Sequence, residues 1–100
     1  MTRPRYSPEA LSQLDEIETY LIEHVGASVA DAYVDRLLDF CDGIATGPVA
    51  GHHRDDLLPG LRTRIFEKHR VVCFLVSSPE VHIIAIFSTS QDWERSLRGR

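Results

Sequence analysis

The chain has 100 residues, an apolar share of 43% and a formal net charge of −4. This length allows one folded domain but not two, and the apolar share excludes a disordered chain. We therefore treat residues 1–100 as a single domain. No apolar run approaches the roughly 20 residues of a membrane-spanning helix, and no apolar signal-peptide segment follows the basic N-terminus. Cys41 and Cys73 lack CxxC spacing and are expected to be reduced core residues of a cytoplasmic protein.

The charged residues are distributed unevenly along the chain. Residues 7–46 contain nine acidic residues and one arginine, whereas residues 47–100 contain eight basic and six acidic residues. A protein that grips nucleic acid by its backbone is expected to be basic over much of its surface. This excludes extensive direct contact with nucleic acid and leaves a small basic patch in the C-terminal half. The acidic half is either a solvated face or a surface for a protein partner.

The N-terminal third predicts an extended segment followed by a helix. We expect Thr2–Tyr6 to form an arm or an edge strand. Ser7-Pro8-Glu9 then carries the signals of a helix start, with a capping serine, a proline in the first turn and an acidic residue near the positive end of the dipole. Apolar residues recur every three or four positions up to Gly26, which is suited to end the helix. They are Leu11, Leu14, Ile17, Tyr20, Leu21 and Val25.

A second amphipathic helix is predicted directly after Gly26. Ser28 and Asp31 resemble a capping box, and Gly47-Pro48 is expected to stop the helix. Its apolar stripe consists of Val29, Tyr33, Leu37, Phe40 and Ile44. Because only one or two residues join the two helices, they are expected to fold back on one another as an antiparallel hairpin.

The segment from Leu58 to Ser88 predicts three antiparallel strands, with turns at Glu67–Arg70 and Ser77–Glu80. The run 71–76 is apolar at every position, which is typical of a central strand with both faces covered. In the preceding strand Arg62 and Arg64 alternate with apolar or neutral residues, so we expect both guanidinium groups to point outward from one face.

The remaining segments are expected to be a loop and a short helix. The loop over 49–57 is polar, and its adjacent His52 and His53 are not spaced to converge on one metal ion. Residues 91–98 predict a final helix in which Trp93 and Leu97 face the same surface.

Together these elements predict an α+β fold in which an N-terminal antiparallel helical hairpin packs on a small antiparallel sheet, in the order β-α-α-β-β-β-α. Two helices cover only one side of three strands, so the other side of the sheet is expected to stay partly open. A partner could fill it with a helix and a strand.

Several segments of the sequence resemble the ParE/RelE superfamily, the toxins of type II toxin–antitoxin systems. The resemblance spans nearly the whole chain, and the ParE branch fits better than the RelE branch. The segments that carry it are Tyr6-Ser7-Pro8-Glu9-Ala10, Leu14-Asp15-Glu16-Ile17, Tyr20-Leu21, Ala30 with Ala32 and Tyr33, Pro48 with Gly51, Arg54 to Arg62, and Ile83-Ile84-Ala85-Ile86.

The two branches imply different activities. ParE-like toxins poison DNA gyrase through protein contact, whereas RelE-like toxins are metal-independent endoribonucleases that cut messenger RNA on the ribosome. For the second activity the matching residues are Arg62, Arg64 and Lys68. Where many relatives have a histidine and an arginine, this chain has Ser88-Thr89-Ser90-Gln91. Serines cannot act as acid or base near neutral pH, which favours the gyrase interpretation. A degenerate toxin that acts only as an antitoxin-binding corepressor is a third interpretation.

The resemblance also implies partners and contact residues. It predicts a hetero-oligomer with a ParD-like ribbon-helix-helix antitoxin, operator DNA contacted only through that antitoxin, and no cofactor, metal or membrane. The residues expected to bind the target are Arg62, Arg64, Arg70, Trp93, Arg95 and Arg98. Those expected to bind the antitoxin are Leu11, Leu14, Ile17, Tyr20, Leu21, Tyr33, Leu37 and Phe40.

Overall fold

The computed structural model describes residues 3–47 and 50–98. The predictions made for Thr2 and Pro48 lie outside these residues. The elements follow one another as β1 (Arg5–Tyr6), α1 (Pro8–Val25), α2 (Ala27–Thr46), β2 (His52–His53), β3 (Arg62–Phe66), β4 (Arg70–Ser77), β5 (Glu80–Ser88) and α3 (Trp93–Leu97).

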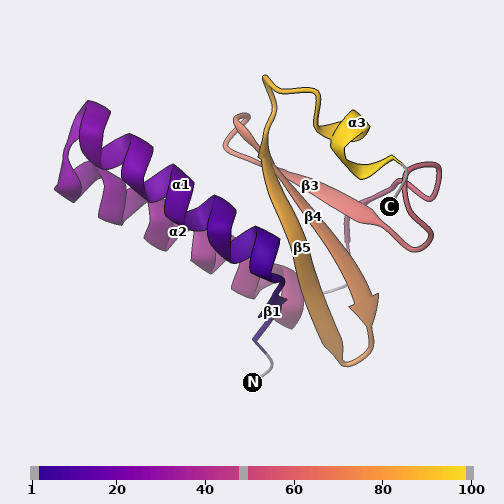
Figure 1. Cartoon of the computed structure of the whole chain (residues 1–100). Helices are drawn as coiled ribbons and strands as arrows, with labels where there is room; N and C mark the ends of the chain where they lie inside the picture. Colours follow the sequence, from indigo (N-terminus) through magenta and orange to yellow (C-terminus); the bar gives the residue numbers. More distant parts are fainter. Residues whose placement is uncertain (1–2, 48–49, 99–100) are drawn as a thin grey trace.

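The molecule has three layers. The helical hairpin of α1 and α2 packs on one face of a sheet, and α3 lies on the opposite face (Figure 1). The predicted α+β architecture is confirmed, and the hairpin extends well beyond the strands. None of the helices among the described residues is long and apolar enough to cross a membrane.

The helical hairpin begins and turns largely as its sequence predicts. The Ser7 side chain caps α1 by accepting a hydrogen bond from the Ala10 backbone N–H at 3.0 Å. Gly26 has a φ of 98°, which favours glycine, and it joins α1 directly to α2. The prediction that Ser28 caps α2 was wrong. The second helix already begins at Ala27 and has no side-chain cap, because Gly26 serves as its N-cap.

The sheet has five strands in the order β1-β5-β4-β3-β2. β4 is central, as its apolar run predicts, and pairs antiparallel with both neighbours. Two features differ from the predicted antiparallel meander. β1 pairs parallel with β5, at Arg5–His82 and Tyr6–Ile83, and the expected loop over 49–57 contains the short edge strand β2. A glycine at position 51 allows the chain to pass here, because a Cβ at this position would lie only 2.8 Å from the Phe74 ring.

Both faces of the sheet carry a hydrophobic core. The hairpin face, which bears Phe66, Val72 and Phe74, packs against the buried side of α1 and α2. The opposite face, here called the α3 face, is covered by α3 and by the loop before β3. Its buried residues are Leu57, Leu61, Val71, Cys73, Ala85, Phe87 and Leu97. The loop and α3 therefore fill most of this face, and the predicted opening is limited to parts such as Ile65, which is 53% exposed.

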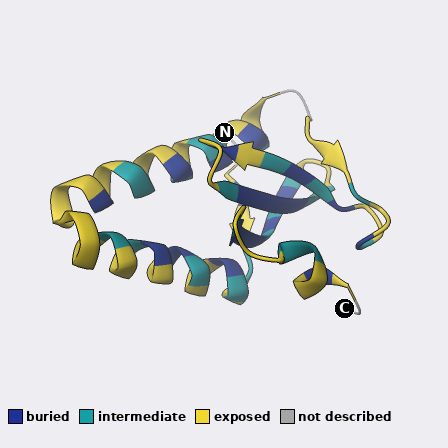
Figure 2. Ribbon diagram, turned by 90° about the horizontal axis from the view of Figure 1, so that it is seen from above, coloured by how far each residue is buried: buried dark blue, intermediate teal, exposed yellow. Residues whose placement is uncertain are grey.

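The exposed parts of the hairpin lie around its turn. Residues 22–29 are all exposed, whereas buried residues line the side of the hairpin that faces the sheet (Figure 2). The apolar stripes are longer than the sheet that covers them. The excess is seen in Val25 and Val29, which are 51% and 53% exposed.

Candidate functional site

The arginines of β3 lie on the hairpin face of the sheet. Arg62 pairs with Phe74 and Arg64 with Val72, and both partners belong to the core under the hairpin. Since residues two apart in a strand share a face, Arg62, Arg64 and the buried Phe66 lie in one row. The prediction that both guanidinium groups share one face is confirmed, but that face lies under the hairpin rather than pointing outward to solvent. Both side chains are half-buried, because α2 covers part of this row.

The surroundings of Arg64 show how the hairpin contacts this row. Its guanidinium lies over the Phe40 ring of α2, 4.9 Å from the ring centre. The rings of Tyr33 and Phe40 both pack on Phe66, which separates Arg64 from Arg70. The sheet arginines therefore lie at two separate places on the hairpin face rather than in one cationic patch.

Arg70 lines a groove of about 500 Å³ between α1 and the end of the sheet. We call this the Arg70 groove, and its other lining residues are Gln13, Glu16, Ile17, Tyr20, Ile86, Ser88, Ser90 and Gln91. The Nε of Arg70 is buried and has no hydrogen-bond partner among the described residues. Ser88, Ser90 and Gln91 at the end of the sheet form a polar part of its lining.

The other residues expected to bind the target lie on the opposite side of the sheet. Arg95 and Arg98 are exposed on α3 and just after it, and Trp93 packs against the core of the α3 face. Trp93 and Leu97 hold α3 on the sheet, as the sequence predicts. The structure therefore divides the six predicted residues between two faces.

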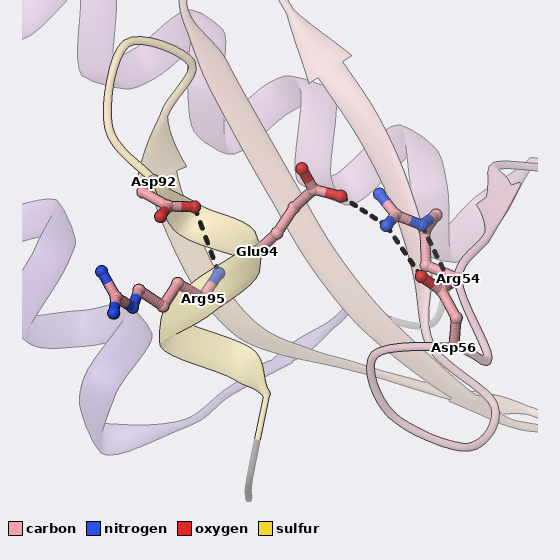
Figure 3. A network of polar contacts seen from close by, with 5 residues as sticks. All are labelled: Arg54, Asp56, Asp92, Glu94 and Arg95. Atoms are coloured by element: carbon pink, nitrogen blue, oxygen red, sulfur yellow. Dashed lines mark hydrogen bonds and ion pairs between the residues drawn. The ribbon is translucent and has the colours of Figure 1, made fainter.

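An ionic network fixes α3 against the loop before β3 (Figure 3). Arg54 donates to both carboxylate oxygens of Asp56, at 3.0 and 2.9 Å, and its Nη2 also bonds to Glu94 of α3. These hydrogen bonds raise the pKa of Arg54 and lower the pKa of Asp56. The Arg54 guanidinium also lies 5.5 Å from the centre of the Trp93 ring. Sequence reasoning missed this role, because no local spacing connects Arg54 with Glu94.

Lys68, the third residue of the ribonuclease interpretation, lies away from the β3 arginines. It is exposed in the turn between β3 and β4, where it and Glu67 both have positive φ angles, of 67° and 46°. Arg36 of α2 holds this turn through two hydrogen bonds to the Glu67 carboxylate, at 2.9 and 3.2 Å. None of Arg62, Arg64 and Lys68 lines the Arg70 groove.

The residues expected to bind the antitoxin divide into a buried and an accessible group. Leu14, Ile17 and Leu37 are core residues with at most 9% exposure, although Leu14 and Ile17 also line grooves. Leu11 and Tyr20 are half exposed. Leu21, Tyr33 and Phe40 are partly buried at the edge of the core.

A second groove, of about 410 Å³, runs between the two helices, and we call it the interhelical groove. Its lining is mostly apolar, with Asp15 and Glu18 at the rim. Its residues are Tyr6, Leu11, Leu14, Asp15, Glu18, Val34 and Leu38. Sequence reasoning found only part of this groove. Val34 and Leu38 were missed because they lie beside the stripe that the helical period selected.

Burial shifts the pKa values of two neighbouring groups at the junction of β1 and α2. Burial raises the pKa of the Cys41 thiol to about 12, and burial also raises the pKa of the neighbouring Tyr6 hydroxyl. Both cysteines are buried and free, as predicted. Within residues 3–47 and 50–98, no three histidine, cysteine or acidic side chains converge as a metal-ligand group.

Comparisons with known proteins agree with this architecture. The family model described as the ParE toxin of the type II toxin–antitoxin system parDE matches residues 5–93. A solved structure titled as the chromosomal ParDE system from P. aeruginosa is 22% identical, with a TM-score of 0.74 over 88% of this chain and 96% of that chain. The solution structure of a conserved hypothetical protein from Helicobacter pylori is 15% identical, with a TM-score of 0.59 over 91% of this chain and 98% of that chain.

No curated protein matches the chain significantly. The two structural likenesses establish a shared fold, and the family match covers nearly the whole chain, from β1 to the start of α3. The chain therefore belongs to the ParE toxin family of type II toxin–antitoxin systems.

Proposed function

We propose that this ParE-family toxin acts in the cytoplasm by binding DNA gyrase, trapping the cleaved-DNA state and so blocking replication. A ParD-like ribbon-helix-helix antitoxin neutralises it in a hetero-oligomer, and operator DNA is contacted through that antitoxin alone. The toxin acts by protein contact, with Arg62 and Arg64 as the principal contact residues, supported by Arg70 or by the Trp93, Arg95 and Arg98 group.

The observation that carries this proposal is the setting of the β3 arginines. Arg62 and Arg64 are partly accessible on the hairpin face, and Arg64 lies against the Phe40 ring rather than against an acid or base. Cutting RNA without a metal requires a base for the 2′-hydroxyl and an acid for the leaving oxygen. A guanidinium held over an aromatic ring, as that of Arg64 is, is instead suited to contact an acidic protein surface.

The antitoxin proposal rests on the surface of the hairpin. The interhelical groove is apolar and bordered by Asp15 and Glu18, and exposed Leu11 lies in its wall. An amphipathic helix with apolar residues on one side and lysine or arginine at its edges complements this groove. The acidic surface of residues 7–46 favours the same basic partner.

One observation favours the ribonuclease alternative. The Arg70 groove holds a guanidinium together with Glu16 and Tyr20, which are a potential base and a potential acid. A corepressor without toxicity is the remaining alternative, and it needs only the antitoxin surface.

Induced expression without the antitoxin separates these functions when two readouts are taken from one culture. Gyrase poisoning predicts filamentation and a DNA damage response with intact transcripts. Rapid transcript cleavage without a damage response would instead establish the ribonuclease. Normal growth with retained antitoxin binding would indicate that the protein acts only as a corepressor.

A further inference from the structure

We propose that the Arg70 groove receives a carboxylate side chain of the antitoxin, which pairs with the Arg70 guanidinium. The inference rests on the proposed function, because it takes the antitoxin as the partner. The proposed contact lies on the opposite side of α1 from the interhelical groove. The antitoxin, otherwise expected to be basic, would supply an acidic residue there.

The groove is built by α1 and by the adjoining ends of β4 and β5. Arg70 is the first residue of β4 and pairs with Ser88 at the end of β5, while Gln13, Glu16, Ile17 and Tyr20 of α1 form the opposite wall. Ile17 and Ile86 are buried, so they give the groove a fixed apolar base. Arg70 thus lies in a preformed recess, in contrast to the exposed Lys68 of the adjacent turn.

The hydrogen-bonding state of Arg70 shows what the groove lacks. Arg36 and Arg54 each donate two hydrogen bonds to a carboxylate, and Arg64 lies over an aromatic ring. Arg70 has no such partner among the described residues, although its Nε is buried. A buried donor without an acceptor is costly, and a carboxylate is the acceptor that fits a guanidinium best. An occupant with an anionic oxygen therefore suits the groove best.

The charges around the groove favour a protein carboxylate over a nucleic acid. Glu16 lies in the groove wall. A nucleic acid strand would bring several phosphates against this carboxylate, at an unfavourable electrostatic energy. A peptide can instead place one acidic residue at Arg70 and one basic residue at Glu16, with an apolar side chain against Ile17 and Ile86.

The edge of β5 indicates that the antitoxin contacts the groove through a side chain rather than by adding a strand to the sheet. β1 covers β5 only at His82 and Ile83. Beyond that point the backbone N–H groups of Ile86 and Ser88 donate to the side-chain oxygens of Gln13 and Gln91. Because these two donors are already satisfied, an added strand would gain little here. Among the described residues that line the groove, the Nε of Arg70 is a buried donor without a partner.

The test measures the affinity of the purified toxin for the antitoxin encoded beside it. We expect Arg70→Gln to weaken binding by about 30-fold, which corresponds to loss of one partly buried charge pair. Arg70→Lys keeps the charge and should give an intermediate loss. Arg36→Gln is the matched control, since it removes an exposed guanidinium that already pairs with Glu67 and lies outside the groove, and it should stay within about threefold. Circular dichroism of each variant verifies its fold.

The partner's acidic residue is located by a second set of variants. Each aspartate or glutamate of the antitoxin is replaced in turn by its amide, alone and with Arg70→Gln. One replacement should weaken binding to wild-type toxin by a similar factor and have no further effect on Arg70→Gln. The absence of any such coupled residue would overturn the proposal.

Two other results would also contradict it. Arg70→Gln toxin that binds the antitoxin within threefold of wild type would show that the groove is not used. Loss of affinity for a short oligoribonucleotide, with antitoxin binding intact, would assign the groove to RNA. If the wild-type toxin fails to bind the antitoxin, the proposed partner itself is wrong, and the expression experiment then decides the remaining function independently.

Discussion

The hydroxyl of Ser7 donates a 2.7 Å hydrogen bond to the carbonyl oxygen of Ile84, 77 residues later in the chain. The same Oγ accepts the bond from Ala10 that caps α1. Ile84 is the extra residue of a bulge in β5, where the register with β4 shifts between Cys73 and Phe74. One side chain therefore fixes both the start of the first helix and the irregular point of the last strand.

Replacing Ser7 by alanine should destabilise the domain by about 1–2 kcal/mol, because it removes a helix cap and leaves the Ile84 carbonyl without this donor. Urea denaturation followed by circular dichroism measures the change. Ser28→Ala is the matched control, since Ser28 makes no capping bond and should change stability by less than about 0.5 kcal/mol. Equal losses from both substitutions would contradict the role assigned to Ser7.

Replacing Arg54 by alanine should loosen α3 while leaving the hairpin intact. The substitution removes the ion pairs to Asp56 and Glu94 and the contact with Trp93. We expect trypsin to cleave after Arg95 about five to ten times faster, because cleavage requires local opening of α3. Mass spectrometry of the fragments locates the cut.

Arg36→Ala provides the control for this experiment. It also removes a guanidinium paired through two bonds with a carboxylate, but the pair joins α2 to the turn before β4. It should leave cleavage after Arg95 unchanged. Faster cleavage in both variants would mean that general destabilisation, rather than release of α3, is responsible.

Replacing Arg62 by alanine should relieve growth arrest while leaving antitoxin affinity within about tenfold. The reason is that Arg62 lies on β3, away from the interhelical groove. Plating after induction measures growth arrest, and calorimetry with the antitoxin measures the affinity. Lys68→Ala separates the two activities. If the toxin poisons gyrase, this variant should still arrest growth; if the toxin is a ribonuclease, the variant should lose its toxicity. Undiminished arrest by folded Arg62→Ala would remove this residue from the effector surface.

Cys41 and Cys73 should resist alkylation in the native protein. Both are fully buried, and burial raises the pKa of Cys41 to about 12, so its thiolate is scarce at pH 8. Because the pKa is higher in the folded state, the contribution of Cys41 to folding stability is fully present below about pH 8.5, the pKa of the unfolded thiol. This contribution is lost as the pH rises towards 12. Iodoacetamide labelling should therefore be slow until denaturant is added, and rapid native labelling would contradict this burial.

Local patterns predicted the elements whose signals lie within a few residues. The capping serine, the helical period and Gly26 located α1, and the continuous apolar run located β4. The parallel pairing of β1 was beyond such reasoning, because it joins residues 77 positions apart. β2 was missed since two exposed histidines carry no strand pattern and are held only by pairing with β3.

The functional residues show a similar division. Alternation correctly grouped Arg62 with Arg64, but only the packing of α2 on Phe66 determines that this row faces the hairpin. A periodic apolar stripe cannot tell Leu14 in the core from Leu11 at the surface, because that depends on which side of α1 faces the sheet. The groove around Arg70 combines residues from α1, β4 and β5, and no sequence motif connects them.

The most direct test of the account incubates the purified toxin with DNA gyrase and supercoiled plasmid, and then denatures the enzyme. The account predicts that linear DNA, covalently attached to gyrase, accumulates with wild-type toxin and returns to the background level with Arg62→Ala. Unchanged supercoiling activity and no trapped cleavage, at toxin concentrations well above those of gyrase, would contradict gyrase as the target.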